Sequence, residues 1–277
     1  MIIVADGGST KCDWAFIEKS EKVIYQKTKG FNPNINNDSE IKLILESLSL
    51  NRNDVVEIYY FGSGCSSPEI KSSLKQVFDC VFKKSKNNIF HDLEGSALAC
   101  CGKEKGIACI LGTGSNICEW NGKEIVENDL YFGNGYILGD EGSGSHLGKL
   151  LIREAFTGGL GKELLERFTL EFGNRDQIIQ KVYSRPGANV FLASCTHFIS
   201  QNKENTVIKS IIYEAFEVFV QTNLFQISPL KNLPVNFVGS VAAIFKVELH
   251  EVLLKHNYVC NKVVQNPLEE IVKAILN

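Results

Sequence analysis

The chain has 277 residues, of which 44% are hydrophobic and 22% charged, which is typical of a globular protein long enough for two domains. Its net charge of −3 provides no basic surface for nucleic acid or an anionic membrane, and no apolar run approaches the roughly 18 residues of a membrane span. Nine cysteines without a CxxC spacing, and an N-terminus that carries Asp6 but no basic flank, predict a cytoplasmic protein with reduced thiols and no signal peptide.

The first half of the chain predicts strands and helices in alternation. Strands are indicated at 1–5, 12–18, 22–28, 55–62 and 88–90. Apolar residues at helical spacing indicate a helix over 39–49, with Ser39 as its N-cap, and a second helix opened by Ser67 and Pro68. The last of the strands leads into Asp92 and a helix of small residues.

The second half starts the same pattern again. Strands are predicted at 107–111, 116–120, 123–127, 235–239 and 258–264. Several helices, including a long amphipathic one over 205–226, separate the third of these strands from the fourth. The order of elements in the second half therefore repeats that of the first, with a helical insertion.

One phrase is also written twice in the chain. GSTKCDW begins at Gly8 and GSNICEW begins at Gly114, and the two share glycine, serine, cysteine and tryptophan at matching offsets. We therefore predict two copies of one α/β unit, at 1–105 and 106–277. The last helix, 267–277, is a candidate to pack back on the first domain.

Each copy of the phrase follows a strand that ends in glycine and turns back sharply. Such turns expose backbone N–H groups that hold phosphate oxygens, and glycine permits the close approach. A hairpin turn without a ligand is the alternative for one loop alone, whereas two related loops rich in hydroxyl groups favour phosphate. Asp6, beside the first loop, is predicted to position Mg²⁺, which prefers carboxylate and water ligands. The predicted phosphate-binding residues are Gly7, Gly8, Ser9, Thr10 and Lys11 in the first loop and Gly112, Thr113, Gly114 and Ser115 in the second.

These loops resemble the two phosphate loops of the sugar kinase, actin and chaperone ATPase superfamily, with ADGGSTK as the first and LGTGSN as the second. NFVGSVAA, at 236–243, is similar to the adenosine motif of that superfamily. NGYILGDEGSGSHLG, at 134–148, resembles the N-acetylglucosamine kinase branch, within an ATPase family that also includes 2-hydroxyacyl-CoA dehydratase activators. The resemblance implies an α/β protein of two duplicated ribonuclease H-like domains, the actin-like ATPase fold, which face each other across a nucleotide-binding cleft.

The resemblance also implies roles for single residues. The residues in matching positions are Asp92 as the general base, Asn32, Asp92, Gly135 and Asp140 as sugar contacts, and Gly239 and Ser240 as adenosine contacts. Two structural alternatives stay open, namely Asp92 as a helix N-cap and Asp140 with Glu141 as a solvated acidic turn. The GSG tripeptides at 62–64 and 142–144 lack the spacing of a dinucleotide-binding motif and receive no role.

The expected function is ATP- and Mg²⁺-dependent phosphorylation of an amino sugar, with the 6-hydroxyl of N-acetylglucosamine as the first candidate. Better-known members of the family carry a tryptophan in the sugar segment where this chain has Asn134 and Tyr136, so glucosamine or another hexosamine stays open as the acceptor. Alternatives of another class are a dehydratase-activator ATPase and a sensor that binds nucleotide and sugar without turnover. The expected partners are ATP and the sugar, without nucleic acid or membrane, and a homodimer stays open.

Overall fold

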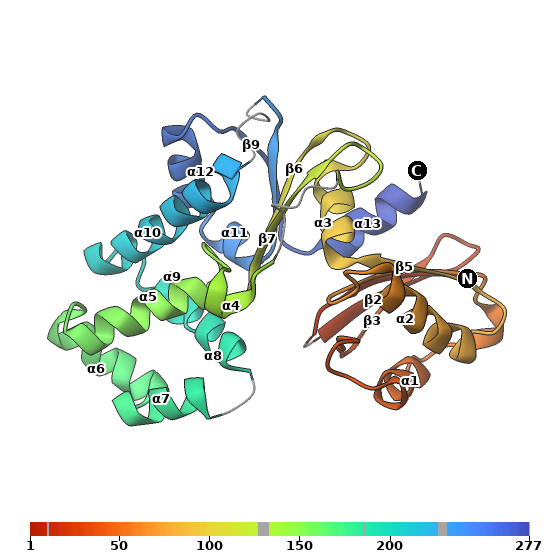
Figure 1. The fold of residues 1–277 in the computed structure, drawn as a ribbon, viewed down its shortest axis with the longest axis horizontal. Helices are drawn as coiled ribbons and strands as arrows, with labels where there is room; N and C mark the ends of the chain where they lie inside the picture. The colour runs from red at the N-terminus through yellow and green to blue at the C-terminus, as the bar shows by residue number, and fades with distance from the viewer. Residues whose placement is uncertain (10, 127–132, 185–186, 227–231, 277) are drawn as a thin grey trace. The chain divides into compact units, whose positions relative to one another are not determined.

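The computed structural model describes residues 1–9, 11–126, 133–184, 187–226 and 232–276, and Figure 1 shows them. They form two compact units. The first unit comprises Met1–Lys103, Gly122–Ile125 and Asn266–Asn277, and the second comprises Glu104–Asn121 and Val126–Gln265. Within the described ranges, no helix combines the length and the apolar character that crossing a membrane requires.

The first unit is built on a five-stranded sheet of order β3-β2-β1-β4-β5. Its strands are β1 (Ile2–Gly7), β2 (Lys11–Ile17), β3 (Val23–Lys29), β4 (Glu57–Gly62) and β5 (Lys86–His91). Its helices are α1 (Asp38–Glu46), the short 3₁₀ turn η1 (Arg52–Asp54), α2 (Pro68–Val81), α3 (Asp92–Cys101) and α13 (Pro267–Leu276). β1, β2 and β3 pair antiparallel, whereas β1, β4 and β5 run parallel.

Helices cover both faces of this sheet. Alternate residues of a strand point to opposite faces, so Ile3 and Ala5 of β1 pack in one core while Val4 packs in another. The first core contains apolar residues of α1 and α2, and the second contains residues of α3 and α13. Trp14 is fully buried, and its indole N–H donates to the Thr28 hydroxyl at 2.9 Å.

The second unit is built on a four-stranded sheet of order β7-β6-β8-β9. Its strands are β6 (Gly106–Leu111), β7 (Ser115–Trp120), β8 (Val235–Val238) and β9 (Cys260–Val264). Its helices are α4 (Gly135–Leu138), α5 (Gly144–Thr157), α6 (Gly161–Phe172), α7 (Arg175–Tyr183), α8 (Ala188–Ser194), α9 (Thr196–Gln201), α10 (Thr206–Thr222), α11 (Ser240–Ile244) and α12 (Lys246–Lys255). One continuous apolar core joins the sheet to the inserted helices.

Four strands follow the same order in the two sheets, and the first sheet adds β3 at its edge. In each, an antiparallel hairpin (β1–β2 or β6–β7) is followed by two further strands that run parallel to its first member (β4 and β5, or β8 and β9). The repeated phrase falls on the same turn and second strand of each hairpin. The predicted duplication of an α/β unit is therefore confirmed.

Two local expectations were wrong. The N-cap of α1 is Asn37, not Ser39, because the Asn37 side chain and that of Glu40 form a reciprocal capping box. The strand expected at 123–127 is not formed in its described part, where only Ile125 makes a bridge; Glu127 lies outside the described residues. Gly122, with φ of 98°, turns the chain after β7, and Gly122–Ile125 groups with the first unit.

Candidate active site

Three parallel strands of the first unit end at one edge of the sheet, and predicted site residues follow them. Gly7 at the end of β1 pairs with Gly62 of β4, which in turn pairs with His91 of β5. Because these residues form one row, the segments just beyond it converge at the carboxyl edge, where ligands bind in open α/β sheets. Asp92 and Ser63 meet there.

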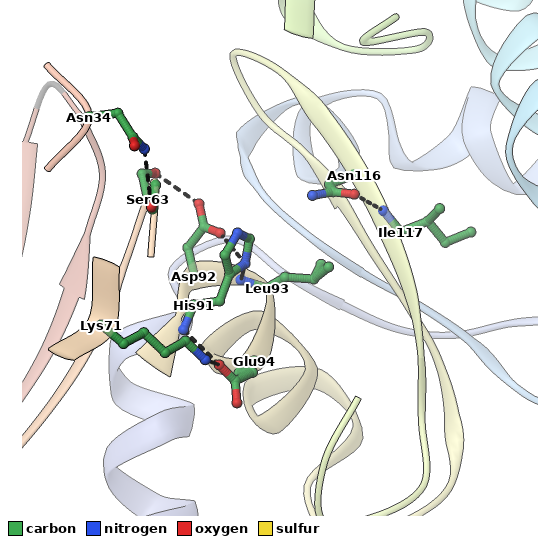
Figure 2. A network of polar contacts seen from close by, with 10 residues as sticks. Asn34, Ser63, Lys71, His91, Asp92, Leu93, Glu94, Asn116 and Ile117 are labelled. Atoms are coloured by element: carbon green, nitrogen blue, oxygen red, sulfur yellow. Dashed lines mark hydrogen bonds and ion pairs between the residues drawn. The ribbon is translucent and has the colours of Figure 1, made fainter. Parts of the chain in front are cut away.

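The Asp92 carboxylate is held through both of its oxygens. The Ser63 hydroxyl donates to Oδ2 at 2.8 Å, and His91 Nδ1 lies 2.9 Å from Oδ1 (Figure 2). Burial alone would raise the pKa of Asp92, but hydrogen bonding and charge from His91, with further hydrogen bonds from Ser63 and the Leu93 N–H, lower it below its usual value. The side chain therefore stays ionised and able to accept a proton.

His91, not Asp92, is the N-cap of α3. His91 Nδ1 accepts from the Leu93 N–H at 3.1 Å, and Glu94 Oε2 accepts from the His91 N–H at 2.7 Å, which completes a capping box. Asp92 is the first residue of the helix. The alternative that Asp92 serves as the N-cap is therefore wrong.

Asp6 lies at the end of β1, beside other carboxylates. Burial, and then the charges of Asp92 and Asp13, raise the pKa of Asp6 to about 7, although Lys11 opposes them. Lys11, predicted to contact phosphate, has its ammonium group 3.1 Å from Asp13 Oδ2. Accumulated negative charge of this kind favours a bound cation.

The donor set fits magnesium held together with a phosphate ligand. Among the described residues, no group of three or more His, Cys, Asp and Glu side chains could hold a metal ion by itself. Mg²⁺ usually keeps several waters and takes one or two carboxylates plus substrate phosphates. Asp6 is suited to the carboxylate part of such a set.

The first predicted phosphate loop is a tight turn packed against Gly30. The Gly8 N–H donates to the Lys11 carbonyl at 2.9 Å and closes the hairpin; Thr10 lies outside the described residues. A Cβ at Gly30 would lie 2.0 Å from the Gly8 carbonyl oxygen, so only glycine fits. Ser9 is exposed at the turn, which leaves its hydroxyl accessible to a ligand.

Asn32 connects the first loop to the segment after β4. Its side-chain N–H₂ donates to the Ser9 hydroxyl at 3.4 Å, and its Oδ1 accepts from the Asn34 N–H at 2.9 Å. Asn34 also donates to the Gly64 carbonyl at 3.1 Å. The first unit thus brings Asn32 beside the first loop and anchors it to the segment that carries Ser63.

The second predicted phosphate loop is fixed by the start of α5. Gly112 N–H donates to the Gly114 carbonyl at 3.0 Å, and the carbonyls of Gly112 and Thr113 accept from the N–H groups of Gly144 and Ser145 at 2.8 and 3.0 Å. A Cβ at Gly112 would meet nothing within 4 Å. The loop carbonyls are therefore turned into the protein, while Gly112 has open space beside it.

Asp140 also supports the second loop. Its Oδ1 accepts from the Ser115 N–H at 3.0 Å, and a Cβ at Gly114 would lie 2.7 Å from its Oδ2. Burial raises its pKa, and its backbone has φ of 61°. Asp140 is therefore not part of a merely solvated turn. Gly135, five residues earlier, is exposed with φ of 71°.

Gly239 and Ser240 lie where α11 begins. Gly239 has φ of 125°, and a Cβ there would lie 2.3 Å from the Leu111 carbonyl oxygen and 3.2 Å from the Gly112 nitrogen. The turn before α11 therefore contacts the strand end that carries the second loop. Ser240 is exposed.

Sequence reasoning missed the function of both GSG tripeptides. Ser63 holds Asp92, and Ser143 caps α5 by accepting from the His146 N–H at 3.2 Å. It also missed His91 and the ion pair of Glu94 with Lys71, at 2.8 Å. The position of each tripeptide in the sequence could have indicated these roles, because one lies at the end of a buried strand and the other at the start of a helix.

Comparisons with solved structures define the class of protein. A candidate N-acetylglucosamine kinase from Porphyromonas gingivalis aligns with a TM-score of 0.93 and 34% identity, over 99% of this chain and 98% of that one. A candidate N-acetylglucosamine kinase from Chromobacterium violaceum aligns with a TM-score of 0.72 and 17% identity, over 99% and 98%. A ROK family glucokinase from Streptomyces griseus, in complex with glucose and AMPPNP, has a TM-score of 0.58 and 13% identity, over 99% and 97%. The fold is that of actin-like ATPase sugar kinases.

Sequence comparison adds a curated relative. The N-acetylmuramic acid/N-acetylglucosamine kinase of Clostridium acetobutylicum is 28% identical over 231 residues, which cover 77% of this chain and 75% of the relative. No protein-family model matches the chain. On the full-length likeness to the P. gingivalis protein, the chain belongs to the N-acetylglucosamine kinase-like family of sugar kinases. It is therefore a phosphotransferase.

Proposed function

We propose that the enzyme transfers the γ-phosphoryl group of ATP to the 6-hydroxyl of N-acetylglucosamine, with Asp92 as the general base. The names of the P. gingivalis and C. acetobutylicum relatives support the acceptor, and the AMPPNP complex of the S. griseus glucokinase supports the nucleotide. The observation that carries the proposal is the position of the Asp92 carboxylate at the carboxyl edge of the first sheet, where the Ser63 hydroxyl donates to it. Because His91 is the N-cap of α3, the Asp92 side chain is not needed for that role.

Asp92 accepts the proton of the sugar hydroxyl as that oxygen attacks phosphorus. Enzymatic phosphoryl transfer depends mainly on positioning and charge neutralisation, so the base contributes by orienting the hydroxyl and removing its proton. The hydrogen bond from Ser63 fixes the rotation of the carboxylate. Its lowered pKa keeps Asp92 ionised at neutral pH.

The phosphate-binding role belongs to the two glycine loops. In Gly7–Lys11 and Gly112–Ser115, the N–H groups of Gly8, Gly112 and Ser115 donate inside the protein, so other groups of these loops contact the phosphate oxygens. Gly239 and Ser240 contact adenosine. Mg²⁺, when bound with ATP, neutralises phosphate charge, and Asp6 is the residue that would hold it. The carboxylates that raise the pKa of Asp6 support this assignment, because a cation there relieves their repulsion.

The sugar-binding role belongs to Asn32, Gly135 and Asp140, together with Asp92. Asn32 offers an amide beside the first loop, and exposed Gly135 offers backbone without a side chain in the way. Asp140, fixed by the Ser115 N–H, offers its second carboxylate oxygen to a sugar hydroxyl.

Coupled ADP release across a panel of sugars tests the acceptor. The panel contains N-acetylglucosamine, glucosamine, N-acetylmannosamine, N-acetylmuramic acid and glucose, each with ATP and Mg²⁺. N-acetylglucosamine is expected to give the highest kcat/KM. A preference for glucosamine would replace the acceptor, and no stimulation by any sugar would contradict the proposed kinase reaction.

A further inference from the structure

Two side chains of α5 hold segment 135–142, which carries two of the proposed sugar contacts. The Lys149 ammonium group donates to the Tyr136 carbonyl oxygen of α4 at 2.8 Å. The Gly142 N–H, at the other end of the segment, donates to His146 Nδ1 at 3.0 Å. Residues three apart lie on one side of a helix, so a single side of α5, which lies beside α4 in Figure 1, contacts both ends of the segment.

Local structure alone does not fix this segment. α4 is a single turn of four residues, and its N-cap Asn134 makes no side-chain hydrogen bond; such short helices are unstable by themselves in water. Ile137 and Leu138 are 75% and 80% exposed, so they do not anchor the segment in the core. Asp140 has φ of 61°, an unfavourable conformation for a residue other than glycine, which persists only where surrounding contacts impose it. The contacts from α5 therefore help to determine where the segment lies.

We propose that Lys149 and His146 position the sugar-binding residues of segment 135–142, which deepens the proposed function and rests on it. Lys149 fixes the carbonyl group of the residue that follows Gly135. His146 fixes the N–H group two residues after Asp140. Because both ends of the segment are held before the sugar binds, less conformational freedom is lost on binding. Neither side chain needs to touch the sugar itself.

The charge of Lys149 supports this arrangement. The Gly142 N–H is a donor, so His146 Nδ1 must carry a lone pair, and it does so only in the neutral ring. Burial, and then the charge of Lys149, lower the pKa of His146 and favour that neutral form, although nearby glutamates oppose them. Burial raises the pKa of Asp140, and the Ser115 N–H and Lys149 oppose this rise. Lys149 thus favours the neutral form of His146 and the ionised form of Asp140.

Kinetics of Lys149 variants test the positioning role. A lysine that only stabilised the fold would not affect one substrate more than the other. Lys149→Met removes the ammonium group and keeps an apolar stem. We expect its KM for N-acetylglucosamine to rise about tenfold, as for the loss of a hydrogen bond from a charged group, while the Kd of ATP stays unchanged. Lys149→Arg retains a charged donor and should keep KM near the wild-type value.

Variants of His146 test the other end of the segment. His146→Asn keeps an acceptor, the side-chain carbonyl oxygen, in place of Nδ1 and should behave like the wild type. His146→Leu removes the acceptor and should raise KM for N-acetylglucosamine without changing the Kd of ATP. Lys162→Met in α6 is the matched control, since Lys162 is exposed and its loss should change neither value.

The possible outcomes separate the positioning role from the proposed function. A wild-type sugar KM in Lys149→Met or in His146→Leu, or an equal loss of sugar and ATP binding, would overturn the positioning role alone. An unchanged sugar KM in Asp140→Asn would instead defeat the proposed sugar contact, and the positioning role with it. Phosphorylation of no sugar by the wild type would defeat the proposed kinase reaction and everything that rests on it.

Discussion

At the scale of single residues, the site depends on side chains whose protonation is set by their neighbours. Asp92 is kept ionised by hydrogen bonds from His91 and Ser63, whereas Asp6 has its pKa raised by burial and by adjacent carboxylates. Two aspartates at one sheet edge thus have pKa values shifted in opposite directions. Different surroundings commonly give two carboxylates of one site different roles. The first suits proton acceptance and the second suits a metal.

Replacing Asp6 should stabilise the protein while it impairs function. Because the pKa of Asp6 rises from 3.8 to about 7 in the fold, its ionisation disfavours the folded state as pH increases through that interval. Asp6→Asn should therefore raise Tm at pH 8 and leave it unchanged near pH 3. Thermal unfolding with and without ATP and Mg²⁺ measures both effects: the wild type should gain stability from the pair and the variant should gain little. A lower Tm for Asp6→Asn at pH 8 would contradict the charge argument.

At the scale of elements, glycines decide how closely the loops approach one another. A Cβ at Gly239 would lie 2.3 Å from the Leu111 carbonyl oxygen, and φ of 125° is itself unfavourable for alanine. A Cβ at Gly112 would meet no atom within 4 Å. The first glycine is therefore required by the fold, and the second is available for a ligand.

Alanine substitutions at these two glycines should separate stability from nucleotide binding. Gly239→Ala should lower the free energy of unfolding by roughly 1–3 kcal/mol, the usual cost of a residue forced into such a conformation. Gly112→Ala should leave stability unchanged and raise KM for ATP, because the new methyl group obstructs phosphate. Denaturant unfolding and initial-rate kinetics provide the two readouts. Unchanged KM for ATP in Gly112→Ala would count against the second phosphate loop.

How far the sequence predicts these elements depends on the range of the interactions. Hairpins and amphipathic helices follow from local patterns, and the Ser67 cap was predicted correctly. The cap of α1 was missed because Asn37, Ser39 and Glu40 compete within one turn. The contact of Ser63 with Asp92 depends on the register of strands far apart in the sequence, which no local pattern encodes.

At the scale of the whole molecule, one α/β unit occurs twice and each copy carries a glycine loop after its first strand. The repeated phrase indicates this duplication in the sequence, because the turn and second strand of the hairpin need similar residues in both copies. The first copy adds carboxylates at its sheet edge, and the second adds a helical insertion and Asp140 beside its loop. The two units thus share the arrangement of their strands but carry different residues beside their glycine loops.

Transfer of labelled phosphate tests the central claim most directly. With ATP labelled at the γ-position, Mg²⁺ and N-acetylglucosamine, the wild-type enzyme should produce labelled sugar 6-phosphate. Asp92→Asn should do so at least about a hundredfold more slowly while it still binds ATP, because loss of a general base costs about 10²–10⁴ in rate. Near-normal transfer by Asp92→Asn, or no labelled N-acetylglucosamine phosphate from the wild type, would contradict it.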